Sequence, residues 1–215
     1  MQNLHRLFDN NKALVEQVTR DDPDFFRRRA GKQEPHFLFI GCADSRVPIE
    51  TLTGSLPGEM FVHRNIANQV LAADLNVLAV LQYAVEVLDV EHVAVCGHYQ
   101  CGGVKAAMGT DSYGLVDYWL AGIRDQVQRH RSEIESHATE QARFNRVVEL
   151  NVMKQVHNLS RTPIVQSAWK RGRRPMLHGM VYDIHDGLLK PVVMQVDGQD
   201  KVKALLEADR RGVGL

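Results

Sequence analysis

The sequence has no excess of charge of either sign. Its 215 residues include 26 lysines and arginines and 26 aspartates and glutamates, so the formal net charge at pH 7 is zero. A balanced charge creates no general attraction to polyanions. We therefore expect a protein that binds neither nucleic acid nor an anionic membrane surface.

Long apolar stretches and abundant cysteines are also missing. No uninterrupted apolar run reaches the roughly 20 residues that a membrane helix needs, and the amino-terminal segment lacks the features of a secretory signal. The three cysteines cannot all pair within one chain, and a reducing compartment would keep them as thiols. The expected location is the cytoplasm, with no membrane segment.

Strands and helices are expected to alternate along the chain. Short apolar runs predict strands at 36–41, 60–65, 92–98, 176–187 and 188–196. Helical spacing predicts helices at 69–88, 114–133, 138–159 and 199–208, and one more that begins after Cys101. This order predicts an α/β fold, with a mostly parallel central β-sheet flanked by helices, in a single domain over residues 1–215.

Residues 1–30 are expected to form a helical arm. Leucine and phenylalanine recur at helical spacing, and Asp21-Asp22-Pro23 marks a break before a second short helix at 25–30. The arm has too little apolar surface to fold alone. It is expected to pack on the main body or on another subunit.

Two predicted strands end beside residues that bind soft metals. Cys42 follows the apolar run HFLFIG, and His98 and Cys101 follow the run HVAVCG. Because loops at the carboxyl ends of parallel strands meet at one edge of a sheet, the three side chains can approach one another. Two thiolates and one imidazole suit Zn²⁺ and leave one coordination position open, which indicates catalysis.

The remaining cysteine has a different environment. Cys96 lies inside the apolar run VAVCG, where a buried structural thiol is expected. A single H-x-x-C motif would be weak evidence for a metal site. The combination of a cysteine at each of two strand ends, with histidine beside one and Asp-Ser-Arg beside the other, is specific.

Three segments closely resemble the β-class carbonic anhydrases of the bacterial type. They are CADSR at 42–46, PGEMFVHRNIAN at 57–68 and GHYQCGG at 97–103. The resemblance extends at least from Gln33 to Met108. It implies a zinc enzyme that catalyses the reaction CO₂ + H₂O ⇌ HCO₃⁻ + H⁺.

The resemblance implies catalytic roles for Asp44 and Arg46. Asp44 would accept a hydrogen bond from zinc-bound hydroxide and orient its attack on carbon dioxide, while Arg46 would hold Asp44 through a charge-assisted pair. In the family, this aspartate can also bind zinc as a fourth ligand, which closes the site. The pair is therefore expected to act as a switch as well as a catalytic dyad.

The resemblance also implies residues for the carbon dioxide pocket. Gln33, Phe61 and Tyr83 would line it, partly across a subunit boundary. Gly103 is a further candidate because it is small enough to let a substrate approach its backbone amide, although a glycine pair before a helix is often only a turn.

One regulatory site of the family has a changed residue in this sequence. Some bacterial members of the family are inhibited by bicarbonate at a site of tryptophan, arginine and tyrosine, to which Phe39, Arg64 and Tyr182 correspond here. Phenylalanine has no N–H group to donate to the anion. We therefore expect weak inhibition by bicarbonate.

The partners implied are carbon dioxide, bicarbonate and further copies of the chain. The arm and the shared pocket predict a homodimer or a homotetramer, with the arm packing on a partner subunit. Two alternatives stay open at this point. One is hydrolysis of carbon disulfide or carbonyl sulfide on the same fold, and the other is a non-catalytic zinc or redox protein.

Overall fold

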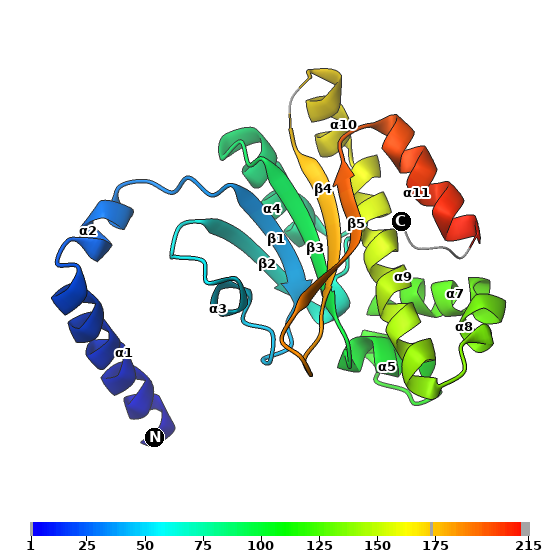
Figure 1. Cartoon of the computed structure of the whole chain (residues 1–215), viewed down its shortest axis with the longest axis horizontal. Coiled ribbons are helices and arrows are strands. Elements are labelled where there is room, and N and C mark those ends of the chain that lie inside the picture. Colours follow the sequence, from blue (N-terminus) through cyan, green and yellow to red (C-terminus); the bar gives the residue numbers. More distant parts are fainter. Residues whose placement is uncertain (1, 173, 212–215) are drawn as a thin grey trace. The chain divides into compact units, whose positions relative to one another are not determined.

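The structure is a computed structural model that describes residues 2–172 and 174–211. It divides into two compact units, Met1–Glu34 and Pro35–Leu215. The first unit holds two helices, α1 (Gln2–Asp21) and α2 (Phe25–Ala30) (Figure 1). The short helix predicted at 25–30 is confirmed. Four apolar side chains of α1 are more than half exposed: Leu4, Leu7, Phe8 and Leu14.

The second unit is built on one five-stranded sheet. Its strands are β1 (Phe37–Cys42), β2 (Met60–Asn65), β3 (His92–His98), β4 (Met176–Tyr182) and β5 (Leu189–Val196). The order is β2-β1-β3-β4-β5; the first four strands are parallel, and β5 pairs antiparallel to β4 (Figure 1). The predicted α/β fold with a mostly parallel sheet flanked by helices is confirmed.

The helical elements of this unit vary greatly in length. They are α3 (Ile49–Thr53), the 3₁₀-helix η1 (Ile66–Asn68), α4 (Leu75–Gln82), the π-helical turn η2 (Tyr83–Val87), α5 (Gly102–Met108), α6 (Leu115–Trp119), α7 (Ala121–Arg129), α8 (Arg131–Ser136), α9 (Glu140–Arg161), α10 (Pro163–Lys170) and α11 (Gln199–Arg211). Among the described helices, none combines the length and the apolarity that crossing a membrane requires.

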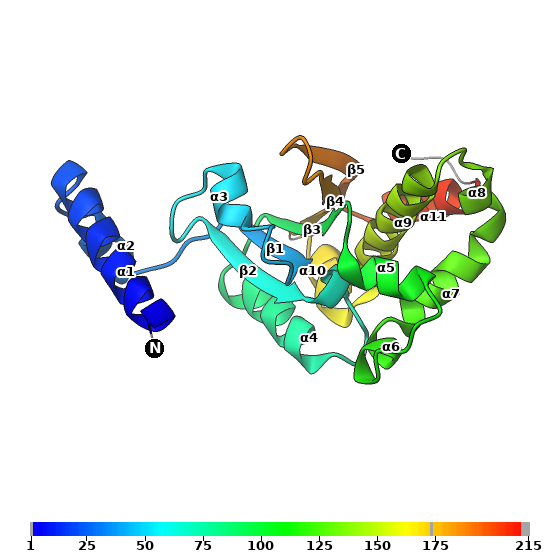
Figure 2. The same ribbon diagram turned by 90° about the horizontal axis from the view of Figure 1, so that it is seen from below.

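The two faces of the sheet bury different sets of side chains. Leu38 and Ile40 of β1 belong to the main core, which also includes residues of α4 and α9. Phe39 points to the opposite face and packs in a smaller cluster with Ile49 of α3. Figure 2 shows α3 and α4 on opposite sides of the sheet. Burial on both faces explains why β1 and β3 have continuous apolar runs rather than alternating patterns.

Glycines let α9 approach the sheet closely. A Cβ atom added to Gly97 of β3 would lie 2.8 Å from Cγ2 of Val152, and one added to Gly179 of β4 would lie 2.7 Å from Cγ1 of the same valine. Both distances are too short for a carbon contact. The missing side chains at these two positions therefore determine where the longest helix of the unit lies.

The helix predicted at 69–88 begins later than expected. Asp74 caps α4 by accepting a hydrogen bond from the Asn76 amide at 3.0 Å, and residues 69–74 form a loop. The side chain of Gln69 donates to Asn151 of α9, and the Val70 amide donates to Gln155. These tertiary hydrogen bonds replace the ones that a longer helix would make.

The helix predicted at 114–133 is divided into α6, α7 and α8. The chain turns at Leu120 and at His130, whose backbone angles are not helical. After the second turn, Glu133 accepts hydrogen bonds from His130 and from Arg146 of α9. Contacts with α9 outweigh the helical propensity of this segment.

Two helices were not predicted, and one strand was predicted too long. The five residues of α3 are too few for a periodic signal, whereas α10 begins with Thr162 and Pro163, a cap and first-turn pair that the sequence does contain. The strand predicted at 176–187 ends at Tyr182. Residues 183–188 form the turn to β5, in which Gly187 has a φ of +75°.

We expect Gly179→Ala to destabilise the protein. Its new Cβ would meet the side chain of Val152, and overpacking of this kind costs about 1–3 kcal/mol. Gly122→Ala is the matched control, because nothing lies within 4 Å of its added Cβ in α7, and it should stabilise the protein by about 0.4–1 kcal/mol. Urea unfolding measures both changes. Equal stability of the two variants would show that the packing of α9 is not limited by Gly179.

Candidate metal centre

The structure brings three potential metal ligands together at one edge of the sheet. Cys42 ends β1, His98 ends β3 and Cys101 follows three residues later. Their ligand atoms all lie within 4.8 Å of one another, and all three residues are buried. The Sγ atoms of the two cysteines are 3.9 Å apart. The sequence-based prediction that these residues converge is therefore confirmed.

The backbone around the ligands explains this convergence. Parallel pairing aligns Gly41 of β1 with Cys96 of β3, so both strands end at the same level of the sheet. Gln100 then adopts a φ of +60°, and Cys101 occupies the N-cap position of α5. This left-handed residue turns the chain sharply and allows His98 and Cys101 to face the same point.

His98 has one ring nitrogen engaged and one available. Nδ1 donates to the carbonyl oxygen of Tyr99 at 3.0 Å, so that Nε2 keeps its lone pair in the neutral ring. The side chain is fully buried, and no hydrogen-bond partner for Nε2 exists among the described residues. A buried nitrogen without a partner is costly, unless a metal ion accepts its lone pair.

The two thiols share a proton. The Cys101 thiol can donate to the Cys42 thiolate, and this hydrogen bond is the main reason why the pKa of Cys42 is lowered. The same pairing, together with burial, raises the pKa of Cys101. Backbone amides of Asp44 and Ala67 further favour the Cys42 thiolate. A divalent cation between the sulfurs would displace the shared proton, as metal binding by thiolates requires.

Asp44 and Arg46 form a bidentate ion pair beside the ligands. Oδ1 of Asp44 accepts from Nε of Arg46 at 2.9 Å, and Oδ2 accepts from Nη2 at 2.7 Å. These bonds hold the pKa of Asp44 well below its usual range. Oδ2 also lies 3.6 Å from Nε2 of His98. An ionised carboxylate therefore stands beside the metal ligands.

Two arginines join the loops that carry the ligands. Arg46 reaches across to the carbonyl oxygen of Gln100 at 3.3 Å. Arg64 of β2 donates to the carbonyl oxygen of Cys42 at 2.9 Å and to that of Asp44 at 2.6 Å. Sequence reasoning did not predict this bracing by Arg64, because main-chain acceptors leave no trace in the residue pattern.

A buried amide ladder supports the segment on the other side of the site. Ala67 lies in η1 with a φ of +59°, and its amide contributes to the lowered pKa of Cys42. Its carbonyl oxygen accepts from Asn151 and from Gln69, both at 3.0 Å. Gln155 donates to Asn151 in turn, at 2.9 Å. The contacts of Ala67 with the cysteine therefore depend on α9.

The donor set fits one particular kind of ion. Two thiolates and a neutral imidazole are ligands for Zn²⁺, which prefers four-coordinate sites and keeps one position open when it is catalytic. Within the described part of the chain, Cys42, His98 and Cys101 are the one cluster of three or more such side chains. Cys96 is not in it: burial raises its pKa to about 12, and its thiol donates to the Gly97 carbonyl oxygen.

Comparison with known proteins identifies the family. A family model described as carbonic anhydrase matches residues 37–189. A carbonic anhydrase from Emericella nidulans is 42% identical over 193 residues, which cover 90% of this chain and 85% of that protein. This chain belongs to the β-carbonic anhydrase family.

Solved structures of β-carbonic anhydrases have the same fold. A Coccomyxa β-carbonic anhydrase in complex with acetazolamide is similar with a TM-score of 0.89 at 37% identity, covering 97% of this chain and 94% of that chain. A structure from work on two tetrameric β-carbonic anhydrases of Sordaria macrospora has a TM-score of 0.85 at 36% identity. The match covers 89% of this chain and 98% of that chain. The family is zinc-dependent and hydrates carbon dioxide, and the cysteine–histidine–cysteine cluster is present in this chain.

The residues predicted to line the carbon dioxide pocket fall in both units. Phe61 and Tyr83 lie together in the second unit, with ring centroids 5.8 Å apart, and Tyr83 is 45% exposed. Gln33 is an exposed residue of the first unit. Gly103 has a packing reason of its own, because an added Cβ would lie 2.9 Å from the side chain of Ile66.

The three residues that correspond to the bicarbonate site have different environments. Phe39 and Tyr182 are buried in the same small cluster, on the face of the sheet that α3 covers. Arg64 is exposed, but its guanidinium already donates to the two carbonyl oxygens described above. The phenyl ring of Phe39 has no polar atom to add to this group.

Removing Arg46 should raise the pKa of Asp44. We expect Arg46→Gln to bring it back toward its ordinary value of 3.8, because both charged hydrogen bonds are lost. The pKa of Asp44 is lower in the folded protein than its ordinary value of 3.8. Ionised Asp44 therefore stabilises the folded wild type above pH 3.8, and this contribution is lost as the pH falls through the lower pKa of the folded protein. Carboxyl ¹³C NMR of the metal-free protein measures the titration. Arg131→Gln, which breaks an exposed pair with Glu135, is the control; an equal shift of Asp44 in both variants would contradict the assignment.

Proposed function

We propose that this chain hydrates carbon dioxide reversibly with a Zn²⁺ ion bound by Cys42, His98 and Cys101. The observation that carries the proposal is the cluster of three buried ligand atoms within 4.8 Å, one of them a histidine nitrogen with no partner among the described residues. When bound, zinc supplies a Lewis acid that makes water reactive near neutral pH.

Asp44 is proposed to orient the attacking water. As an ionised carboxylate it can only accept hydrogen bonds, so a nucleophile that donates to it must point its lone pair elsewhere, toward carbon dioxide. Arg46 keeps the carboxylate ionised and fixes its direction through the bidentate pair. Because Oδ2 of Asp44 lies 3.6 Å from Nε2 of His98, Asp44 would also be a candidate for a fourth metal ligand in a closed state.

The substrate pocket is proposed to include Phe61, Tyr83, Gly103 and Gln33. The two aromatic rings offer an apolar surface for a linear molecule without net charge. Gln33 would complete the pocket from a partner subunit. The exposure of Tyr83 agrees with a site that needs a second copy of the chain to be closed.

A homodimer or homotetramer is the proposed assembly. The apolar side chains of α1 are more than half exposed, and burying them on a partner would remove about 25 cal/mol per Å² of unfavourable hydration. The Sordaria proteins are tetrameric. We propose further that residues 1–215 act as one domain in which 1–30 is an arm on the partner subunit, and that the protein is cytoplasmic, where thiols stay reduced.

We favour carbon dioxide as the proposed substrate over carbon disulfide or carbonyl sulfide. The reason is that the matching relatives carry the name carbonic anhydrase. A non-catalytic role is less well supported for the same reason. The two enzymatic possibilities are separated by stopped-flow hydration of carbon dioxide, run beside sulfide release from carbon disulfide.

We expect Cys42→Ser to lose zinc and activity together. Loss of one thiolate should lower the zinc content well below one ion per chain, and the rate of carbon dioxide hydration should fall by about a hundredfold or more. Elemental analysis and stopped-flow kinetics measure the two effects. Cys96→Ser is the control and should keep both, since this thiol faces the opposite side of the sheet. Full zinc occupancy in Cys42→Ser would remove Cys42 from the ligand set.

We expect bicarbonate to inhibit only weakly. Phe39 offers no donor to an anion, and two donors of the Arg64 guanidinium already bind main-chain acceptors. Phe39→Trp restores an indole N–H and should strengthen the inhibition. Initial rates measured at rising bicarbonate concentration, above and below neutral pH, test this. Strongly cooperative inhibition of the wild type below neutral pH would contradict the expectation.

A further inference from the structure

Tyr99, the residue that follows His98, is held by hydrogen bonds to three other residues. Its amide donates to the carbonyl oxygen of Tyr182 in β4 at 2.9 Å. Its hydroxyl donates to Oε1 of Glu149 in α9 at 2.8 Å. Its carbonyl oxygen accepts from Nδ1 of His98 at 3.0 Å. The acceptor that orients the imidazole of His98 therefore belongs to a residue that is fixed to two other elements of the fold.

Glu149 is itself fixed through both of its carboxylate oxygens. Oε1 accepts from Tyr99, and Oε2 accepts from Nη1 of Arg146 at 3.1 Å. Arg146 is only 7% exposed, and its Nε donates to Glu133 of α8 at 2.6 Å. Because a buried charge that loses its partner is strongly destabilising, Arg146 keeps both carboxylates in contact with it. We call Tyr99, Glu149, Arg146 and Glu133 the Tyr99 network.

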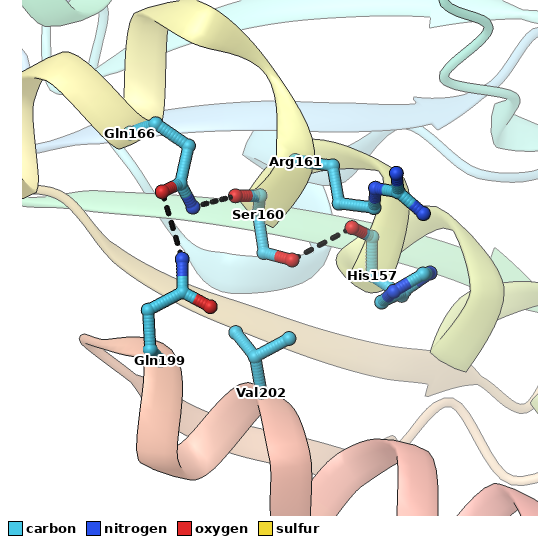
Figure 3. Close-up of a pocket in the computed structure, with 6 residues that line it drawn as sticks. All are labelled: His157, Ser160, Arg161, Gln166, Gln199 and Val202. Carbon is cyan, nitrogen blue, oxygen red and sulfur yellow. Dashed lines mark hydrogen bonds between the residues drawn. The ribbon is translucent and has the colours of Figure 1, made fainter.

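The helix α9, which carries two members of this network, is also anchored at its far end. Gln166 of α10 donates to the carbonyl oxygen of Ser160, and Gln199 of α11 donates to Gln166 at 2.7 Å (Figure 3). The Ser160 hydroxyl donates to the carbonyl oxygen of His157 at 2.7 Å. Together with the close packing on the sheet described above, these contacts fix the position of the helix. Its carboxylate is therefore a fixed acceptor for the Tyr99 hydroxyl.

The peptide unit between Tyr99 and Gln100 is held on its other side as well. Gln100 has a φ of +60°, and its carbonyl oxygen accepts from Arg46 at 3.3 Å. Its side-chain amide forms a hydrogen bond with Nε2 of His185, in the turn between β4 and β5. Because a peptide unit is planar, the direction of the Tyr99 carbonyl group is set by the two residues that flank it. Both of these residues are anchored.

Packing of α8 on α9 does not account for the whole Tyr99 network. One carboxylate is enough to balance the charge of Arg146, and Glu133 provides it. Glu149 adds a second carboxylate, whose other oxygen binds Tyr99. In a histidine that binds a metal ion, the hydrogen bond of the other ring nitrogen fixes the tautomer and the ring orientation. The Tyr99 carbonyl oxygen makes this bond to His98.

We propose that Tyr99 and Glu149 are positioning residues for the metal ligand His98. The inference rests on the zinc centre proposed above. Through the fixed carbonyl group of Tyr99, the two residues keep Nδ1 of His98 engaged and leave Nε2 for the metal ion. Neither residue is one of the three ligands, so their effect is on the strength of metal binding.

Transfer of zinc from the loaded, full-length protein to a chelator tests the proposal. Tyr99→Phe removes only the hydroxyl, and Glu149→Ala removes its acceptor, so we expect each to weaken zinc binding by about tenfold or more. Both changes break the same contact. The double variant should therefore lose little beyond Tyr99→Phe, whereas independent effects would multiply. Tyr118→Phe is the matched control and should keep the wild-type affinity, because Tyr118 is 83% exposed.

NMR of the zinc-loaded protein separates positioning from general stability. The proton on Nδ1 of His98 should exchange with water faster in Tyr99→Phe than in the wild type, because its acceptor is no longer fixed. Backbone amides in the middle of β3 should keep their wild-type exchange, since a local change does not open the sheet. A merely stabilising hydroxyl would lower the urea midpoint and leave exchange at His98 unchanged.

The outcomes distinguish this proposal from the proposed function. A wild type that binds no zinc contradicts the proposed function. The positioning role alone is overturned if the wild type binds zinc and Tyr99→Phe keeps its affinity, or loses it with unchanged exchange at His98. It is also overturned if Tyr118→Phe loses as much, or if the effects of the single variants multiply in the double variant. Tyr99→Phe changes one atom, so it serves if Glu149→Ala does not fold.

Discussion

The parallel pairing of β1 with β3 is the constraint on which the metal centre depends. It ends both strands at one edge of the sheet, and so places Cys42 beside two ligands that lie more than fifty residues away in the sequence. The sulfur atoms then approach to 3.9 Å. Two thiolates at this distance would repel each other. A shared proton, or a divalent cation, resolves that repulsion.

The helix α9 supports this arrangement in two different ways. Its valines fit against the bare glycines of β3 and β4, which brings the helix axis close to the sheet. Its amide side chains bind the loop that contains Ala67, whose own amide stabilises the Cys42 thiolate. Apolar contact and buried hydrogen bonding therefore act on the same element. Since buried amides without partners are costly, the loop and the helix hold each other in one arrangement.

Secondary structure was predictable where local pattern and tertiary contact agree. The strands at 60–65 and 92–98 were predicted with their observed bounds, and the second of them is a short apolar run buried on two faces. The segment 69–74 was wrongly predicted as helical, since its apolar spacing is helical but Gln69 and Val70 bond to α9. The bracing role of Arg64 had no signal at all, because carbonyl acceptors are present at every residue.

The sequence by itself determined the class of site: cysteine and histidine after two apolar strands select a soft divalent cation, and the Asp-Ser-Arg next to them supplies an ionised carboxylate. It also determined the fold class, through the alternation of strands and helices. Only the tertiary structure decided which nitrogen of His98 is left for a metal ion and how Asp44 is held. These depend on distances between atoms, which residue order does not contain.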